Sequence, residues 1–422
     1  MTQTWQLLRT GVLTLCWLLV LPGFFVLFSA IIPVIPWVRI YAFDVVPNRA
    51  PWFLLSALAV LLIGSLAHSR RATGVTASLV ATATITMLVA TGVLAHFLYI
   101  ADSNGVRINL VDTLSTRQFS DNAGPDESRI YSRPRGEPLW LDVYRPPKTP
   151  WSARSPVLMV VHGGGFVEGT REVGAANMRT YADQGWTVIS IDYRLARADR
   201  PTWNLATRDV LCALAWTAKH ADTLAIDINR LTLSGASAGG SLAIAAGYSA
   251  GTGGYDVECG SPVPRVAAVV AKAPLIDPLG SWQNPGELQG LQRSYMTRYL
   301  GGAPDQYPER YAAADVRRYL ARSNPPTLIL AGARDPLLPA AAVENFAAKS
   351  TALGGRTRLV MFPYSGHAFN TTFDSVTNQT VIQVIAQFMT AHGVAPEAAS
   401  TGQREYAAAQ ESGLRVLGSP SR

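Results

Sequence analysis

The stretch LTLSGASAGGSLAIAAGYSAG, residues 231–251, contains the pattern G-x-S-x-G twice. The first copy centres on Ser237 and directly follows 230–233, a short segment with the apolar pattern of a buried strand. The Ala-rich residues after it are typical of a helix. A serine on a sharp strand-to-helix turn is the arrangement of a nucleophile elbow, where Gly235 and Gly239 relieve crowding of the backbone. We therefore predict Ser237 as a nucleophile.

The second copy centres on Ser249, at the carboxyl end of the same predicted helix. Gly251, Gly253 and Gly254 follow it and indicate a helix stop and a turn. No strand precedes this serine, so the context of an elbow is missing. We interpret the second match as chance.

A serine nucleophile needs a base and an acid that orients it, and in elbow proteins the chain order is Ser, Asp or Glu, His. His367 and His392 are the two histidines after Ser237. His367 lies in the loop PYSGHAF just beyond the predicted strand RLVMF, where a catalytic base is expected. His392 ends the last predicted helix, where a cation near the helix terminus is explanation enough. We predict His367 as the base.

Two aspartates compete for the role of the acid. Asp335 follows the predicted strand PTLILAG, and Asp277 follows VVAKAPLI. We prefer Asp335 because its strand is the last one before the strand that leads to His367, so the two loops should be neighbours. Asp335 could also cap the helix after it.

An oxyanion requires hydrogen-bond donors, and VVHGGGFVEG, residues 160–169, offers them. Consecutive glycines after a buried strand let backbone amides approach a substrate oxygen closely. We predict an oxyanion hole from two of Gly163, Gly164 and Gly165 together with the amide of Ala238. His162 is interpreted as a residue that holds this loop, rather than as a second base.

Strand and helix patterns alternate along the rest of the chain, which predicts βαβ units and a mostly parallel sheet with helices on both faces. The expected strands are 139–144, 157–161, 187–191, 230–233, 266–271, 326–330 and 358–362, and the expected helices are 174–184, 204–220, 237–249 and 378–392. We place this domain at 138–393. Polar residues 101–137 are expected to form a linker or collar, and 394–422 a disordered tail.

These motifs together resemble the hormone-sensitive-lipase-like group of α/β hydrolases, which are carboxylesterases and lipases. The resemblance rests on HGGGF at 162–166, DYRLA at 192–196, GASAGG at 235–240, DPL at 335–337 and GHAF at 366–369. Ala236 and Arg197 depart from the group's usual G-D-S-A-G and DYRLAP. The resemblance implies the α/β-hydrolase fold and a cap over the site.

Residues 278–324 are interpreted either as a lid or as an ordinary helical insertion. Asp192 and Arg194 are expected to form a structural ion pair or hydrogen-bond hub.

The first 100 residues differ sharply from the rest of the chain. Segments 11–32 and 74–100 are long and almost free of charge, and 51–67 is shorter and marginal. We expect about three transmembrane helices; buried helices of a soluble protein are the alternative. This start is similar to that of membrane-anchored mycobacterial esterases. With three spans, Arg9, Arg70 and Arg71 lie on one side, against Arg39 and Arg49 on the other. This small bias favours an extracytoplasmic catalytic domain.

Charge and cysteine content indicate which kinds of partner and cofactor to expect. The net charge is +7, but Lys and Arg are scattered and form no stripe with aromatic residues, so nucleic acid is not expected as a partner. No cofactor or metal is predicted, since no Cys/His cluster has ligand spacing. Cys212 and Cys259 are either a disulfide suited to an oxidising compartment or two unrelated buried thiols.

The sequence thus predicts a membrane-anchored serine carboxylesterase or lipase, with a lipid or envelope ester as the substrate. The same residues would serve an acyltransferase, in which an envelope alcohol or sugar replaces water. A catalytically silent binding scaffold is a second alternative, although it would normally lose Ser237 or His367. A serine peptidase is a third alternative, which the HGGG motif at 162–165 disfavours.

Overall fold

The computed structural model describes residues 3–32, 35–115, 117, 124–147, 154–250, 259 and 262–396. The predicted tail therefore lies almost entirely outside the described residues. The chain divides into two compact units. One, here the helical unit, comprises 1–118, 332–336 and 361–381; the other, here the sheet unit, comprises 119–331, 337–360 and 382–422.

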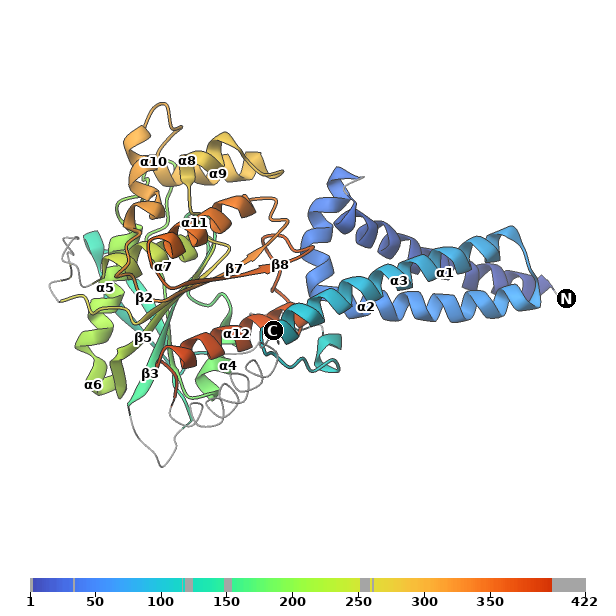
Figure 1. The fold of residues 1–422 in the computed structure, drawn as a ribbon, viewed down its shortest axis with the longest axis horizontal. Coiled ribbons are helices and arrows are strands. Elements are labelled where there is room, and N and C mark those ends of the chain that lie inside the picture. Colours follow the sequence, from blue (N-terminus) through green and yellow to red (C-terminus); the bar gives the residue numbers. More distant parts are fainter. Residues whose placement is uncertain are drawn as a thin grey trace, which may run out of the picture. The chain divides into compact units, whose positions relative to one another are not determined.

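Three long helices make up most of the helical unit: α1 (Gln3–Ile31), α2 (Pro36–Arg70) and α3 (Gly74–Ser103). They lie side by side (Figure 1). Each is long and apolar enough to cross a membrane. Leucines such as Leu18 and Leu62 are 66% and 64% exposed, which suits a lipid environment better than water. The three helices match the three segments that the sequence predicted, except that α1 ends at Ile31, one residue before the end of the predicted segment 11–32.

Helix α2 begins earlier than expected and is bent. Residues 36–48, read from the sequence as part of a loop, are helical, and Arg49 interrupts the helix with φ −136° and ψ 15°. Pro47 and Pro51 flank this residue, and a proline inside a helix removes a backbone hydrogen bond and favours a kink. We call residues 36–48 the α2 arm.

The sheet has eight strands in the order β1-β2-β4-β3-β5-β6-β7-β8. Their bounds are β1 Glu127–Ser132, β2 Leu139–Tyr144, β3 Ser155–Val161, β4 Thr187–Ile191, β5 Ile226–Ala236, β6 Ala268–Lys272, β7 Thr327–Gly332 and β8 Thr357–Phe362. The run from β4 through β3, β5 and β6 to β7 is parallel, while β1 and β2 pair antiparallel. The predicted mostly parallel sheet is confirmed.

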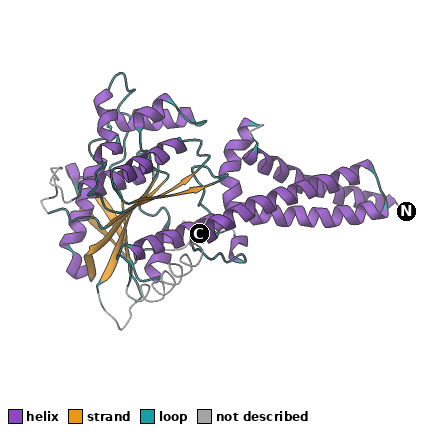
Figure 2. Ribbon diagram, viewed as in Figure 1, coloured by secondary structure: helices purple, strands orange, loops and turns teal. Residues whose placement is uncertain are grey.

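Helices lie on both faces of the sheet (Figure 2). They are α4 Ala175–Asp183, α5 Ala206–Lys219, α6 Ala221–Leu224, α7 Ala238–Ser249, α8 Pro278–Gln283, α9 Gln289–Leu300, α10 Pro308–Ala314, α11 Ala340–Ala352 and α12 Val376–Ala391, with short 3₁₀ turns at η1 Asp112–Leu114, η2 Pro134–Gly136 and η3 Val316–Tyr319. Every residue of β4 and β7 is buried, which explains their continuous apolar sequences.

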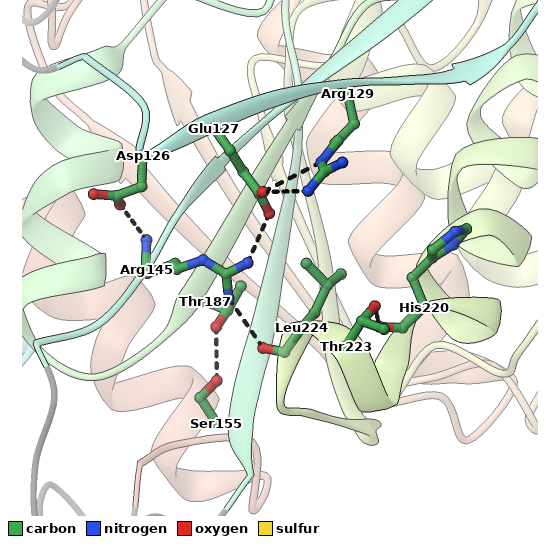
Figure 3. Close-up of polar contacts among 9 residues, drawn as sticks. All are labelled: Asp126, Glu127, Arg129, Arg145, Ser155, Thr187, His220, Thr223 and Leu224. Atoms are coloured by element: carbon green, nitrogen blue, oxygen red, sulfur yellow. Dashed lines mark hydrogen bonds and ion pairs between the residues drawn. The ribbon is translucent and has the colours of Figure 1, made fainter.

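Strand β1 lies in the region that the sequence predicted as a linker. Its sequence, ESRIYS, contains one buried residue, Tyr131, so it lacks the alternation that marks a strand. Its polar side chains are engaged at the sheet edge instead. Glu127 accepts hydrogen bonds from Arg129 and Arg145, and Asp126 accepts from the Arg145 amide (Figure 3).

Candidate active site

Ser237 lies at the turn between β5 and α7, as predicted. Its backbone adopts φ 53° and ψ −120°, a conformation that residues other than glycine rarely adopt. The amide of Ser237 donates to the carbonyl of Lys272 at 2.7 Å, which holds the turn in place. A Cβ atom at Gly235 would lie 2.1 Å from the Gly239 carbonyl oxygen, and one at Gly239 would lie 2.2 Å from that of Val161. Both glycines are therefore needed for the turn.

Ser249 occupies a different environment. It is the last residue of α7, and its buried hydroxyl donates to the Ala245 carbonyl at 2.6 Å. An intrahelical bond of this kind satisfies the hydroxyl without any base. Ser249 thus ends a helix, and it does not lie on a strand-to-helix turn as Ser237 does.

The loop that follows β3, residues 162–169 and here called the glycine loop, lies against the elbow. A Cβ atom at Gly163 would lie 3.4 Å from the Cβ of Ser237. Gly164 and Gly165 have φ of 109° and 59°, and a Cβ at Gly164 would lie 2.0 Å from the Glu168 carbonyl. Within the described part of the chain, nothing accepts a hydrogen bond from the amides of Gly163, Gly164 or Gly165. These donors are available to a ligand.

Ala238 is the first residue of α7 and is 1% exposed. The first amides of a helix have no intrahelical partner and carry partial positive charge. The amide of Ala238 therefore suits an anionic oxygen beside Ser237.

His162 is buried and supports the loop. Its Nδ1 lies 2.7 Å from the Gly163 carbonyl oxygen, and its ring stacks on Tyr193 at 4.4 Å between centroids. Burial lowers the pKa of His162, which keeps the ring neutral. This environment fits a residue that holds the loop.

Asp192 and Arg194 are structural residues, as predicted, but each is held by hydrogen bonds and an ion pair with its own partner. Asp192 binds Arg171 at 2.9 Å, whereas Arg194 forms a buried pair with Asp209 at 2.6 Å. Asp209 lies in α5, and no local pattern links it to the DYRLA motif. Two separate pairs, rather than one, hold this segment.

The predicted base and acid lie within the helical unit. His367 follows β8 and Asp335 follows β7, and His367 Nδ1 lies 2.7 Å from Asp335 Oδ2. Asp335 is 4% exposed. Burial favours neutral imidazole, but the carboxylates of Asp335 and Asp44 outweigh it and raise the pKa of His367. Asp44 is on the α2 arm, and sequence analysis did not find it.

Asp277, the rival acid, is engaged elsewhere. Its side chain accepts the amide of Gly280 as the N-cap of α8, and it pairs with Arg317 at 2.6 Å. Both contacts lie in the segment between β6 and β7. This is the ordinary structural use of a capping aspartate.

The insertion 278–324 forms α8, α9, α10 and η3. Tyr295 of α9 donates to Glu168 at 2.7 Å, and a Cβ atom at Gly165 would lie 2.4 Å from the Tyr295 ring. Phe166 stacks on Tyr299 at 3.7 Å. The insertion thus rests directly on the glycine loop, a contact that the aromatic-rich sequence alone did not specify.

A cavity of about 460 Å³ adjoins the glycine loop inside the sheet unit. Its lining is mostly apolar and aromatic and includes Phe166, Trp203, Leu242, Tyr248, Tyr299 and Tyr319. A volume of this size is typical of a small-molecule site.

Cys212 and Cys259 form a disulfide, with Cα atoms 5.6 Å apart. Of the two alternatives that the sequence left open, the structure has the bonded one. Within the described ranges, no group of three or more His, Cys, Asp or Glu residues could hold a metal ion.

Comparison with known proteins supports this description. The family described as BD-FAE matches residues 141–349. Esterase LipC of Mycobacterium tuberculosis is 31% identical over 59% of this chain and 61% of its own length; Esterase LipQ of the same organism is 28% identical over 61% and 60%. The chain therefore spans about three fifths of the length of these curated relatives.

Among solved structures, the butyrate-bound esterase Est2 of Thermogutta terrifontis covers 66% of this chain and 97% of its own, with a TM-score of 0.53 and 22% identity. At this identity the likeness shows the fold. The BD-FAE match and the LipC and LipQ relatives add that the sheet-bearing domain is similar to carboxylesterases of the hormone-sensitive-lipase-like group.

Proposed function

We propose that the protein is a membrane-anchored serine carboxylesterase or lipase with Ser237 as its nucleophile. The observation that carries the proposal is the strained elbow at Ser237, beside glycine amides that no described residue uses. A left-handed backbone at a serine costs roughly 1–3 kcal/mol and is typically retained for function. The esterase names of LipC and LipQ point to the same chemistry.

The order of the strands supports a triad of Ser237, His367 and Asp335. Ser237 follows β5, Asp335 follows β7, and His367 follows β8, which is next to β7 in the sheet. Strands β5 and β7 belong to the parallel run, and residues that follow parallel strands gather at the carboxyl edge, where α/β proteins hold their active sites.

In the proposed reaction, Ser237 Oγ attacks the ester carbonyl carbon and its proton passes to His367 Nε2. Asp335 holds the Nδ1 side of the ring and stabilises the imidazolium. The amides of the glycine loop and of Ala238 stabilise the oxyanion. The alcohol leaves with the proton from His367, and water then attacks the acyl-enzyme with His367 as base. The acid is released and Ser237 is restored.

We place the catalytic domain on the extracytoplasmic side of a membrane, anchored by α1, α2 and α3. The disulfide suits an oxidising compartment, and the excess of arginine near the N-terminus and at residues 70 and 71 suits the cytoplasmic side. A lipid or envelope ester is the proposed substrate. We further propose that 278–324 serves as a lid, since α9 touches the glycine loop.

The test uses full-length protein in detergent micelles and p-nitrophenyl esters of increasing acyl length. Ser237→Ala should lower kcat by at least about 10⁴-fold, because the nucleophile is lost. Ser249→Ala is the matched control from the second motif and should keep wild-type turnover. If an added alcohol captures the acyl group in preference to water, acyl transfer replaces hydrolysis. Equal activity of wild type and Ser237→Ala contradicts the proposal.

A further inference from the structure

The loop that carries His367 is fastened to the α2 arm on both sides of the histidine. The amide of Gly366 donates to the Phe43 carbonyl at 2.7 Å. The amide of Ala368 donates to Asp44 Oδ1 at 3.0 Å, although the two residues are 324 positions apart in the chain. The backbone before and after the imidazole is therefore fixed by one turn of a distant helix.

Asn48, one turn further along the arm, extends this attachment. Its side-chain amide donates to the Ala368 carbonyl at 2.9 Å, and its oxygen accepts the amide of Thr372 at 2.9 Å. Asn48 is 5% exposed. A buried amide with its partners satisfied on both sides specifies one arrangement of the loop, because losing either partner is costly.

The contact leaves little room for movement. A Cβ atom at Gly366 would lie 2.6 Å from Asp44 Oδ1 and 3.0 Å from the Phe43 Cβ. Glycine at 366 therefore lets the loop approach the arm closely. The Asp44 carboxylate therefore lies next to the backbone of Gly366 and binds the amide of Ala368, the two residues on either side of the histidine.

Asp44 also acts on the histidine through its charge. Two carboxylates act on the imidazole: Asp335, after β7, and Asp44, on the α2 arm. Asp335 touches Nδ1 directly, while Asp44 is held by the neighbouring backbone amide. Both carboxylates favour the imidazolium that forms when His367 takes a proton.

We infer that Asp44 is a positioning residue for the base His367: it fixes the loop through the Ala368 amide and stabilises the imidazolium. This inference rests on the proposed function. It makes the α2 arm a part of the active-site support rather than a simple tether, so removing the N-terminal segment should impair catalysis as well as membrane attachment.

Full-length Asp44→Asn in detergent micelles separates charge from geometry, since asparagine can still accept the Ala368 amide. We expect kcat to fall about 10-fold with KM nearly unchanged, because the imidazolium that forms in the transition state is less stabilised. The acidic limb of the kcat/KM profile should move to lower pH, because a carboxylate that favours imidazolium is gone. Asp112→Asn, an exposed aspartate of the same unit, is the matched control.

Asn48→Ala gives the complementary result: it loosens the loop but leaves the charge, so kcat should fall while the acidic limb stays. If Asp44→Asn does not fold, Asp44→Glu replaces it and should retain the wild-type limb with a lower kcat. Asp44 variants with the kcat and limb of Asp112→Asn overturn the inference. A wild-type protein without turnover and without fluorophosphonate labelling at Ser237 instead overturns the proposed function.

Discussion

The elbow at Ser237 and the loop at His367 reach a fixed geometry in different ways. The elbow is fixed locally: Gly235 and Gly239 lie two residues from the serine, and only glycine fits there. The loop of His367 is fixed from a distance, by Asp335, Phe43, Asp44 and Asn48. The geometry of the proposed nucleophile is therefore encoded in a short motif, whereas that of the proposed base depends on the distant helix α2.

The contrast sets what each region tolerates. Substitutions of the elbow glycines should abolish the turn itself. Substitutions around His367 should lower kcat by an amount that increases with how directly the residue contacts the imidazole.

Asp335→Asn should lower kcat by about 10⁴-fold, because asparagine cannot stabilise the imidazolium and favours the wrong tautomer. Esterase kinetics of the full-length protein provide the measurement. Asp277→Asn is the control, since that carboxylate pairs with Arg317 and caps α8; its kcat should stay within a few-fold of wild type. The reverse ranking would make Asp277 the acid.

Gly164→Ala should lower kcat by roughly 10²–10³-fold, the usual cost of losing an oxyanion donor. The added Cβ meets the Glu168 carbonyl at 2.0 Å and the backbone has φ 109°, so the loop must move. Gly290→Ala in α9 has open space around it and serves as the control. Near-equal rates for both variants would remove the glycine loop from the mechanism.

Cys259→Ser should lower the free energy of unfolding by about 3–4 kcal/mol, because the disulfide closes a loop of 47 residues. Thermal melts with and without reductant measure the loss. Because Cys212 lies in α5, within the sheet unit, the effect should appear as lower stability with kcat retained at low temperature. Cys16→Ser, at the free cysteine, leaves the disulfide intact, so it should melt like wild type and show the same drop in melting temperature when reductant is added.

Tyr295→Phe should lower kcat/KM by roughly 5-fold, about the worth of one hydrogen bond, because the hydroxyl that binds Glu168 is removed. The aromatic ring over Gly165 remains, so the loop keeps its shape. Tyr307→Phe, in the same insertion, is the control. A change in acyl-length preference of Tyr295→Phe would add that the insertion contacts the substrate.

The same contrast explains which parts of the structure could be predicted from the sequence and which could not. Alternating apolar strands and helices predicted the parallel sheet, because burial on both faces leaves a continuous pattern. The polar sequence of edge strand β1 predicts a linker, and the sequence of the α2 arm predicts a loop, whereas the structure has a strand and a helix there. Asp44 and Asn48 carry no motif, since their partners lie 324 residues away. Local periodicity cannot report such contacts.

The most direct test of the central claim is the rate at which a fluorophosphonate labels full-length wild type, Ser237→Ala and His367→Ala, with the labelled peptide identified by mass spectrometry. We predict an adduct on Ser237 in wild type, none on Ser237→Ala, and labelling slowed by at least about 10³-fold in His367→Ala, because the base is lost. An adduct on Ser249, or labelling of Ser237 at an unchanged rate without His367, would contradict the account.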